Sequence, residues 1–168
     1  MNETKIRSQL EIATNIIVVL VSIAILSVLT SRILERNSEA HLESGLQRGQ
    51  KLDAFRSSKS ETLVIVSNTN CQACRESVSF YNQLVEQQHK ANSRVAIVAV
   101  FANTPEAVKD YVQQVHLNVP TSVTMELRSL GTPAIIMIDA KGNIGDFWLG
   151  KLTKDEENQV IKAVMRTA

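Results

Sequence analysis

The residues of this chain best suited to covalent chemistry are its two cysteines, which form the sequence Cys71-Gln72-Ala73-Cys74. They follow an apolar, β-branched run, residues 62–66, and a polar stretch, residues 67–70. Three positions apart in a first helical turn, two cysteines lie on one face of the helix and within disulfide range. The amino terminus of a helix stabilises a thiolate on the first cysteine through its free N–H groups and its dipole. We therefore expect a disulfide that opens and closes, with Cys71 as the nucleophile and Cys74 as the resolving cysteine.

Three other interpretations of the pair are half of a zinc site, a static structural disulfide and two unrelated buried thiols. Zinc needs two further ligands, and His41, His89 and His116 stand at no familiar finger spacing, so we expect no metal. A static disulfide across so short a loop removes little chain entropy and therefore adds little stability. The structural disulfide and the unrelated thiols stay open at this stage.

The remaining pattern alternates strands and helices, which is typical of an α/β domain. The strand before Cys71 should be a central one, since it is apolar throughout. Turn-forming residues at 139–143 separate two apolar segments that we expect to pair as a hairpin. The predicted elements are a strand at 62–66, a helix at 71–88, a strand at 95–101, a helix opened by Thr104-Pro105-Glu106, strands at 134–138 and 144–149, and a closing helix after the capping box Thr153-Lys154-Asp155-Glu156.

The amino-terminal segment has the composition of a membrane anchor. Residues 12–31 are uncharged and mostly apolar, and a helix of that length crosses a hydrocarbon core of about 30 Å. No convincing small-residue cleavage site follows, which favours an uncleaved signal anchor over a signal peptide. We predict a cytoplasmic leader at 1–11, a transmembrane anchor at 12–31, a polar tether at 32–44, and one domain at 45–168 on the extracytoplasmic, periplasmic side of the cell membrane.

Charge and aromatic content argue against a nucleic-acid-binding protein. The chain has 18 basic and 17 acidic side chains, and 4% of its residues are aromatic. A nucleic-acid surface needs a basic face to neutralise phosphates and aromatic rings to stack on bases. We therefore expect no nucleic-acid partner.

Five motifs, by their order and spacing, resemble the membrane-anchored, TlpA-like thioredoxin-fold proteins. They are Gly49-Gln50-Lys51-Leu52-Asp53-Ala54-Phe55, the strand at 63–66, Cys71-Gln72-Ala73-Cys74, Gly131-Thr132-Pro133-Ala134 and residues 138–144. The resemblance covers residues 45–168. It implies a thioredoxin-like α/β fold, in which helices flank a central mixed sheet and a helix and a strand are inserted between its two halves. Residues 95–123 resemble the region of that insertion.

The resemblance also implies a redox site and its substrate class. Pro133 would follow a cis peptide bond and face the two sulfurs, a minority state that tertiary packing must hold. The backbone of Thr132 would pair with an extended substrate segment, next to Gln72 and Ala73. The resemblance further implies a protein thiol or disulfide as the substrate, an upstream membrane or periplasmic electron donor, and no cofactor.

Three positions depart from the family pattern. Asn70 stands where Trp commonly precedes the first cysteine, and Ala73 stands where Pro often precedes the second. Ile65, six residues before Cys71, occupies the position at which many thioredoxins bury an acid that moves protons to the second cysteine. Glu76 or solvent would have to take over that proton transfer.

We therefore interpret the chain as a membrane-tethered thiol–disulfide oxidoreductase that reduces protein disulfides outside the cytoplasmic membrane. The alternative is a redox-inactive or disulfide-carrying accessory module for the maturation of an exported protein, since Asn70 and Ala73 are compatible with either tuned or relaxed redox chemistry. A peroxiredoxin-like peroxidase is less favoured, since such a site has a Thr three residues before its cysteine, where this chain has Asn68.

Overall fold

The computed structural model of the chain describes residues 21–23, 27, 45–52, 61–125, 127 and 129–166. The chain divides into two units, Met1–Glu43 and Ser44–Ala168. The predicted leader and tether, and the predicted anchor apart from residues 21–23 and 27, lie outside the described residues. Within the described part, those four residues are helical, and no helix there has the length and apolar character needed to cross a membrane.

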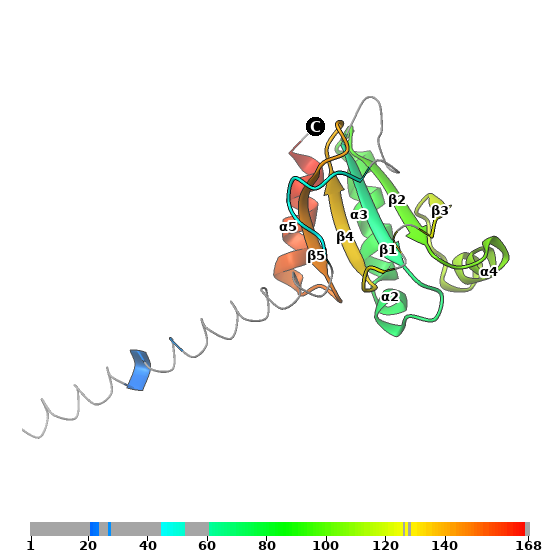
Figure 1. Cartoon of the computed structure of the whole chain (residues 1–168), viewed down its shortest axis with the longest axis horizontal. Helices are drawn as coiled ribbons and strands as arrows, with labels where there is room; N and C mark the ends of the chain where they lie inside the picture. Colours follow the sequence, from blue (N-terminus) through cyan, green and yellow to red (C-terminus); the bar gives the residue numbers. More distant parts are fainter. Residues whose placement is uncertain are drawn as a thin grey trace, which may run out of the picture. The chain divides into compact units, whose positions relative to one another are not determined.

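The second unit is built on a five-stranded mixed sheet with the strand order β3-β2-β1-β4-β5 (Figure 1). Strand β1 pairs in parallel with β2 and antiparallel with β4. β3 extends the parallel half, and β5 pairs antiparallel with β4 as the predicted hairpin partner. The strands are β1 (Thr62–Ser67), β2 (Ala96–Phe101), β3 (Thr121–Val123), β4 (Ala134–Ile138) and β5 (Ile144–Leu149).

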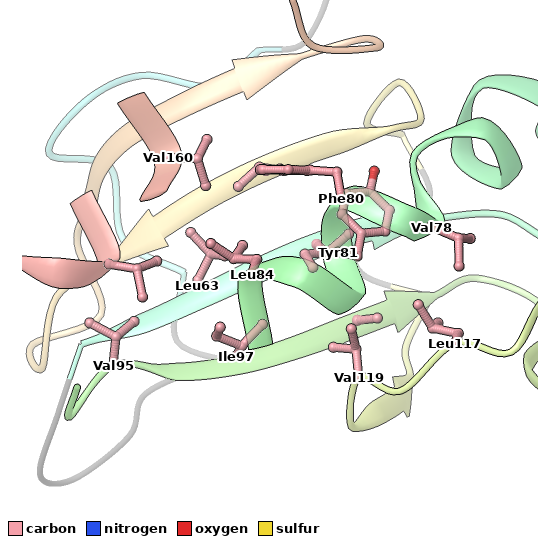
Figure 2. Close-up of a cluster of buried hydrophobic side chains, with 14 of the residues drawn as sticks. Leu63, Val78, Phe80, Tyr81, Leu84, Val95, Ile97, Leu117, Val119 and Val160 are labelled. Atoms are coloured by element: carbon pink, nitrogen blue, oxygen red, sulfur yellow. The ribbon is translucent and has the colours of Figure 1, made fainter. Parts of the chain in front are cut away.

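Both faces of the sheet are covered. Side chains of the central strands point alternately to the two faces and are apolar on both, so each face needs a cover. Leu63 and Ile65 of β1 belong to the first of two buried clusters, which lies on the first face of the sheet. Val64 and Val66 belong to the second cluster, on the opposite face. Helices α3 (Val78–Lys90) and α5 (Lys154–Met165) cover the first face, where Figure 2 shows their side chains packed onto the strands. On the second face Leu46, Leu127 and Leu130 close the core from irregular segments.

The helix starts and the hairpin turn follow the sequence prediction. Helix α4 (Pro105–Val115) begins after Thr104, whose hydroxyl accepts a hydrogen bond from the Ala107 amide. Helix α5 begins with the complete capping box of Thr153 and Glu156. Between β2 and β4, α4 and β3 occupy the region in which an inserted helix and strand were expected.

The predicted continuous helix at 71–88 is wrong in one respect. The segment forms two helices, α2 (Gln72–Glu76) and α3, with Ser77 between them. The Ser77 hydroxyl donates to the carbonyl of Ala73, and the Ser77 amide bonds the carbonyls of both Ala73 and Cys74. A serine that bonds back into the preceding turn competes with the regular helical pattern and bends the chain.

Leu84 tests the packing of α3 against the sheet, because its side chain is fully buried in the first cluster. We expect Leu84→Ala to lower the free energy of unfolding by about 2–5 kcal/mol, through lost burial and an unfilled cavity. The matched variant Gln83→Ala, at an exposed neighbouring position, should change it by no more than about 0.5 kcal/mol. Chemical denaturation of the full chain, followed by circular dichroism, measures both values; equal effects would contradict this packing.

Candidate redox site

The two cysteines form a disulfide at the end of β1, with 5.2 Å between their α-carbons. Cys71 caps the amino terminus of α2, and its sulfur accepts a hydrogen bond from the amide of Cys74 at 3.0 Å. Cys74 is completely buried, whereas Cys71 is only half-buried. The Cys71 sulfur is therefore the more accessible of the two, and the division into an attacking and a resolving cysteine stays a prediction.

The polar loop between β1 and α2 is held by two asparagines. The Asn68 carbonyl accepts from the Cys71 amide at 3.1 Å, and the Asn68 side chain accepts from the Asn70 amide at 2.9 Å. Asn103, which follows β2, accepts from the Thr69 amide through its side-chain oxygen at 3.2 Å. Asn103 was not identified from the sequence, since its only signal was a polar residue just after a buried strand.

Thr132 and Pro133 reach the disulfide from a distant part of the chain. The peptide bond between them is cis, as the family resemblance implied. The Thr132 carbonyl oxygen lies 3.6 Å from the sulfur of Cys71, so this carbonyl is directed toward the sulfur. The Pro133 carbonyl accepts a hydrogen bond from the Gly150 amide at 2.8 Å, which links Pro133 to the segment between β5 and α5.

The two residues between the cysteines have different surroundings. Gln72 is exposed, and its side-chain amide donates to the carboxylate of Glu76 at 2.9 Å. Ala73 is half-buried, and its carbonyl accepts the hydrogen bonds of Ser77. Of these two residues, only Gln72 therefore has an exposed side chain with hydrogen-bonding groups.

Glu76 is held in an ion pair rather than free to accept a proton. Its carboxylate bonds the ammonium group of Lys151 and the amide of Gln72. The hydrogen bonds from Lys151 and Gln72, together with the charge of Lys151, lower the pKa of Glu76. A general base works best with a pKa near the working pH, so this geometry weighs against the expected substitute role of Glu76. Ile65 is fully buried among apolar side chains.

Tyr111 of α4 places a buried hydroxyl group in the first cluster. Among the buried side-chain polar atoms of the described residues, the Tyr111 hydroxyl oxygen is the one that lacks a hydrogen-bond partner within the distance and angle limits of a hydrogen bond. Burial raises the pKa of Tyr111, and the charge of Arg75 and the nearby Ser67 hydroxyl partly offset this rise. Arg75, next to Cys74, is exposed and therefore acts through solvent on its neighbours.

The histidines considered as metal ligands do not gather at the cysteines. His89 lies in the last turn of α3, and His116 is the left-handed carboxyl-terminal cap of α4. His41 lies outside the described residues. Over the ranges that the structure describes, no three His, Cys, Asp or Glu side chains come together as a metal site.

Comparison with known proteins gives structural matches only. No protein-family model and no curated protein matches the chain. The chain is similar to a Chlorobium tepidum structure that carries the name thiol:disulfide interchange protein DsbE, with 15% identity and a TM-score of 0.60 over 73% of this chain and 98% of that chain. StoA from Bacillus subtilis is 14% identical, with a TM-score of 0.54 over 69% of this chain and 93% of that chain.

The peroxidoxin BcpB from Mycobacterium tuberculosis also matches, at 8% identity and a TM-score of 0.56, over 72% of this chain and 97% of that chain. Identities this low establish the fold and leave the activity open. The predicted thioredoxin-like α/β fold, a mixed sheet flanked by helices, is thereby confirmed. Its structural neighbours include thiol–disulfide oxidoreductases, and this chain has the Cys71–Cys74 disulfide.

The ion pair of Glu76 and Lys151 gives a test of the charges around Cys71. In the reduced protein, Lys151→Met leaves a carboxylate unpaired near the first turn of α2 and should raise the pKa of the Cys71 thiol. Glu76→Gln leaves an ammonium group unpaired and should lower that pKa. Alkylation rates of Cys71 as a function of pH measure the two shifts, which should shrink at about 1 M salt, where the screening length is about 3 Å.

The double variant Glu76→Gln/Lys151→Met is the control for this experiment. Its thiol pKa should fall between those of the single variants, because neither charge remains. Shifts of the same sign in both single variants would show that the pair acts by holding α2 in place and not by its charges.

Proposed function

We propose that the chain is a thiol–disulfide oxidoreductase that acts on protein substrates and belongs with the TlpA-like proteins. The observation that carries this proposal is the asymmetry of the disulfide, in which Cys71 is accessible at a helix amino terminus and Cys74 is buried behind it. Such a pair can exchange with an external disulfide through one sulfur and close again through the other. The thioredoxin-like fold and the contact with the Thr132 carbonyl support the same function.

In the reducing direction, the Cys71 thiolate attacks one sulfur of a substrate disulfide. The substrate S–S bond breaks, a mixed disulfide forms on Cys71, and the departing substrate thiolate takes up a proton. Cys74 then loses its proton and attacks the Cys71 sulfur, which releases the second substrate thiol and closes the Cys71–Cys74 bond. Two electrons pass to the substrate, so each cycle requires a thiol donor that reopens the disulfide. We place that donor in the membrane or the periplasm.

The direction of this exchange is tested by the reduction potential of the pair. We expect a midpoint near or below about −270 mV, the range of thioredoxin-type reductases. Titration of the full chain in thiol–disulfide buffers, with free thiols counted by alkylation and mass, measures it. A midpoint near about −120 mV would make the protein an oxidant and would overturn the reducing direction.

We also propose that residues 12–31 anchor the protein in the cell membrane by a single span, with the domain at 45–168 on the extracytoplasmic side. The apolar composition of that segment supports the span, and disulfide chemistry fits an exported location. The full chain expressed in bacteria should resist carbonate extraction, and protease added to spheroplasts should digest the domain. A variant without residues 1–44 should stay in the soluble fraction. Release of the full chain by carbonate would argue against the anchor.

An accessory module remains the second candidate, because apolar Ile65 occupies the position of the buried acid and Glu76 is ion-paired. In that function the domain would hold a partner without exchanging disulfides. Asn68, which stands where a peroxiredoxin-like site has Thr, weighs against a peroxidase, and its side chain holds the loop through the Asn70 amide.

Trapping experiments separate the two candidates. With Cys74→Ser, the resolving step is blocked, so we expect a stable mixed disulfide between Cys71 and substrate proteins on reducing-sensitive gels. Cys71→Ser should trap none. If the variant with both cysteines replaced by Ser still retains the same partner, and Cys74→Ser traps nothing, the accessory function takes the place of the catalytic one.

A further inference from the structure

A cavity of about 390 Å³ opens beside the disulfide at the carboxyl ends of β1 and β2. Val66 and Val100 of these strands contribute apolar surface, and another wall is formed by Thr124, Leu127, Leu130, Gly131 and Thr132. Thr132 belongs to both features, since it lines the cavity and its carbonyl lies 3.6 Å from the Cys71 sulfur. The cavity and the Cys71 sulfur therefore share Thr132 as a common neighbour.

The described lining of the cavity offers hydrogen bonds without charge. Asn68 and Asn103 line it, and the side-chain oxygen of each is taken up by a loop amide. This arrangement orients each planar carboxamide and leaves its NH2 group, a double donor, for another acceptor. A charged side chain placed against such a lining would lose hydration and find no partner among the described residues, which is costly.

Two exposed apolar residues flank, in the sequence, a residue of the cavity lining. Val123 is 40% exposed and Met125 is 57% exposed, and both are neighbours of Thr124 in its wall. In the described part of the second unit these are the exposed large apolar residues. Val123 ends β3, an edge strand whose residues are all exposed and which pairs only with β2 in the sheet. An edge strand with apolar side chains is a surface on which an extended peptide can lie.

We propose that this cavity, together with Val123 and Met125, binds the part of the substrate polypeptide next to its reacting cysteine and selects uncharged segments that carry a large apolar side chain. The inference rests on the proposed function and adds a substrate preference to it. The neutral lining accepts peptide groups, the exposed pair covers the apolar side chain, and an acidic or basic neighbour of the cysteine is disfavoured by desolvation.

The test uses two synthetic peptides of equal length, each with one cysteine in a mixed disulfide with a chromophoric thiol. In one peptide leucines flank the cysteine, and in the other glutamates do. Release of the chromophore by the reduced full chain gives two rates, whose ratio measures selectivity within each variant. We expect the leucine peptide to react faster by about tenfold, which corresponds to about 1.4 kcal/mol.

Two variants locate the selectivity. Ala102→Leu should fill the cavity, which Ala102 lines, and bring the ratio toward one. Met125→Lys, at an exposed position that should not disturb folding, should favour the glutamate peptide and lower the ratio about tenfold. Gln83→Lys adds the same charge at an exposed position of α3 and should leave the ratio unchanged.

Equal rates for the two peptides, or a Met125→Lys ratio equal to that of Gln83→Lys, would overturn the proposal. Hydroxyethyl disulfide, which has no flanking residues, distinguishes this failure from a failure of the proposed function: a wild-type chain that cannot reduce it lacks the redox activity altogether. Light scattering tests whether a second copy of the chain occupies this surface instead of substrate. Dimers that dissociate in Met125→Lys, with an unchanged peptide ratio, would assign the surface to a second copy of the chain and not to substrate.

Discussion

The pairing of β1 with its two neighbours is the constraint on which the redox site depends. Ser67, the last residue of β1, stands opposite Phe101 at the end of β2, and Val66 stands opposite Ala134 at the start of β4. Because β2 runs parallel to β1 and β4 runs antiparallel to it, the end of β1, the end of β2 and the start of β4 meet at one edge of the sheet. The segments that follow β1 and β2 and the one that precedes β4 must therefore converge there. This brings Asn103 to the loop that precedes Cys71 and brings Thr132 to the Cys71 sulfur.

The environment of the Cys71 sulfur is set mainly by the groups next to it, because the helix that follows it is short. Helix α2 has only five residues and ends at Ser77, so it contributes a small macrodipole. The amide of Cys74, which donates directly to the Cys71 sulfur, is the specific stabilising contact. The charges of Glu76 and Lys151 offset each other, and the exposed Arg75 remains as one positive charge on this short helix. The structure thus favours a thiolate on Cys71 through one direct hydrogen bond, with Arg75 as an additional positive charge that solvent screens.

The sequence predicted the features that depend on short-range pattern. The strands follow from apolar runs such as residues 62–66, and the starts of α4 and α5 follow from Thr104 and Thr153, whose capping hydroxyls act within one turn. The break at Ser77 was missed because a serine inside a helical period looks the same whether it faces solvent or bonds backward. Asn103 and Lys151 were missed because their partners, Thr69 and Glu76, lie 34 and 75 residues away. The choice between Glu76 and solvent as the substitute proton acceptor could not be made from the sequence for the same reason, since only the fold reveals Lys151 beside Glu76.

A reductase and an accessory module of the disulfide-carrying kind, which keeps its partner as a mixed disulfide, differ in the rate of one step. The mixed disulfide on Cys71 is resolved only when Cys74 loses its proton, and Cys74 is completely buried. Burial in apolar surroundings disfavours a thiolate. Ile65 provides no carboxylate that could accept the proton of Cys74. Slow deprotonation prolongs the mixed disulfide, so the same chain can behave as a holder of its partner when resolution is slow and as a reductase when resolution is fast. Whatever brings a base to Cys74, whether a group of the bound substrate or water admitted when the disulfide opens, therefore decides between holding a partner and turning it over.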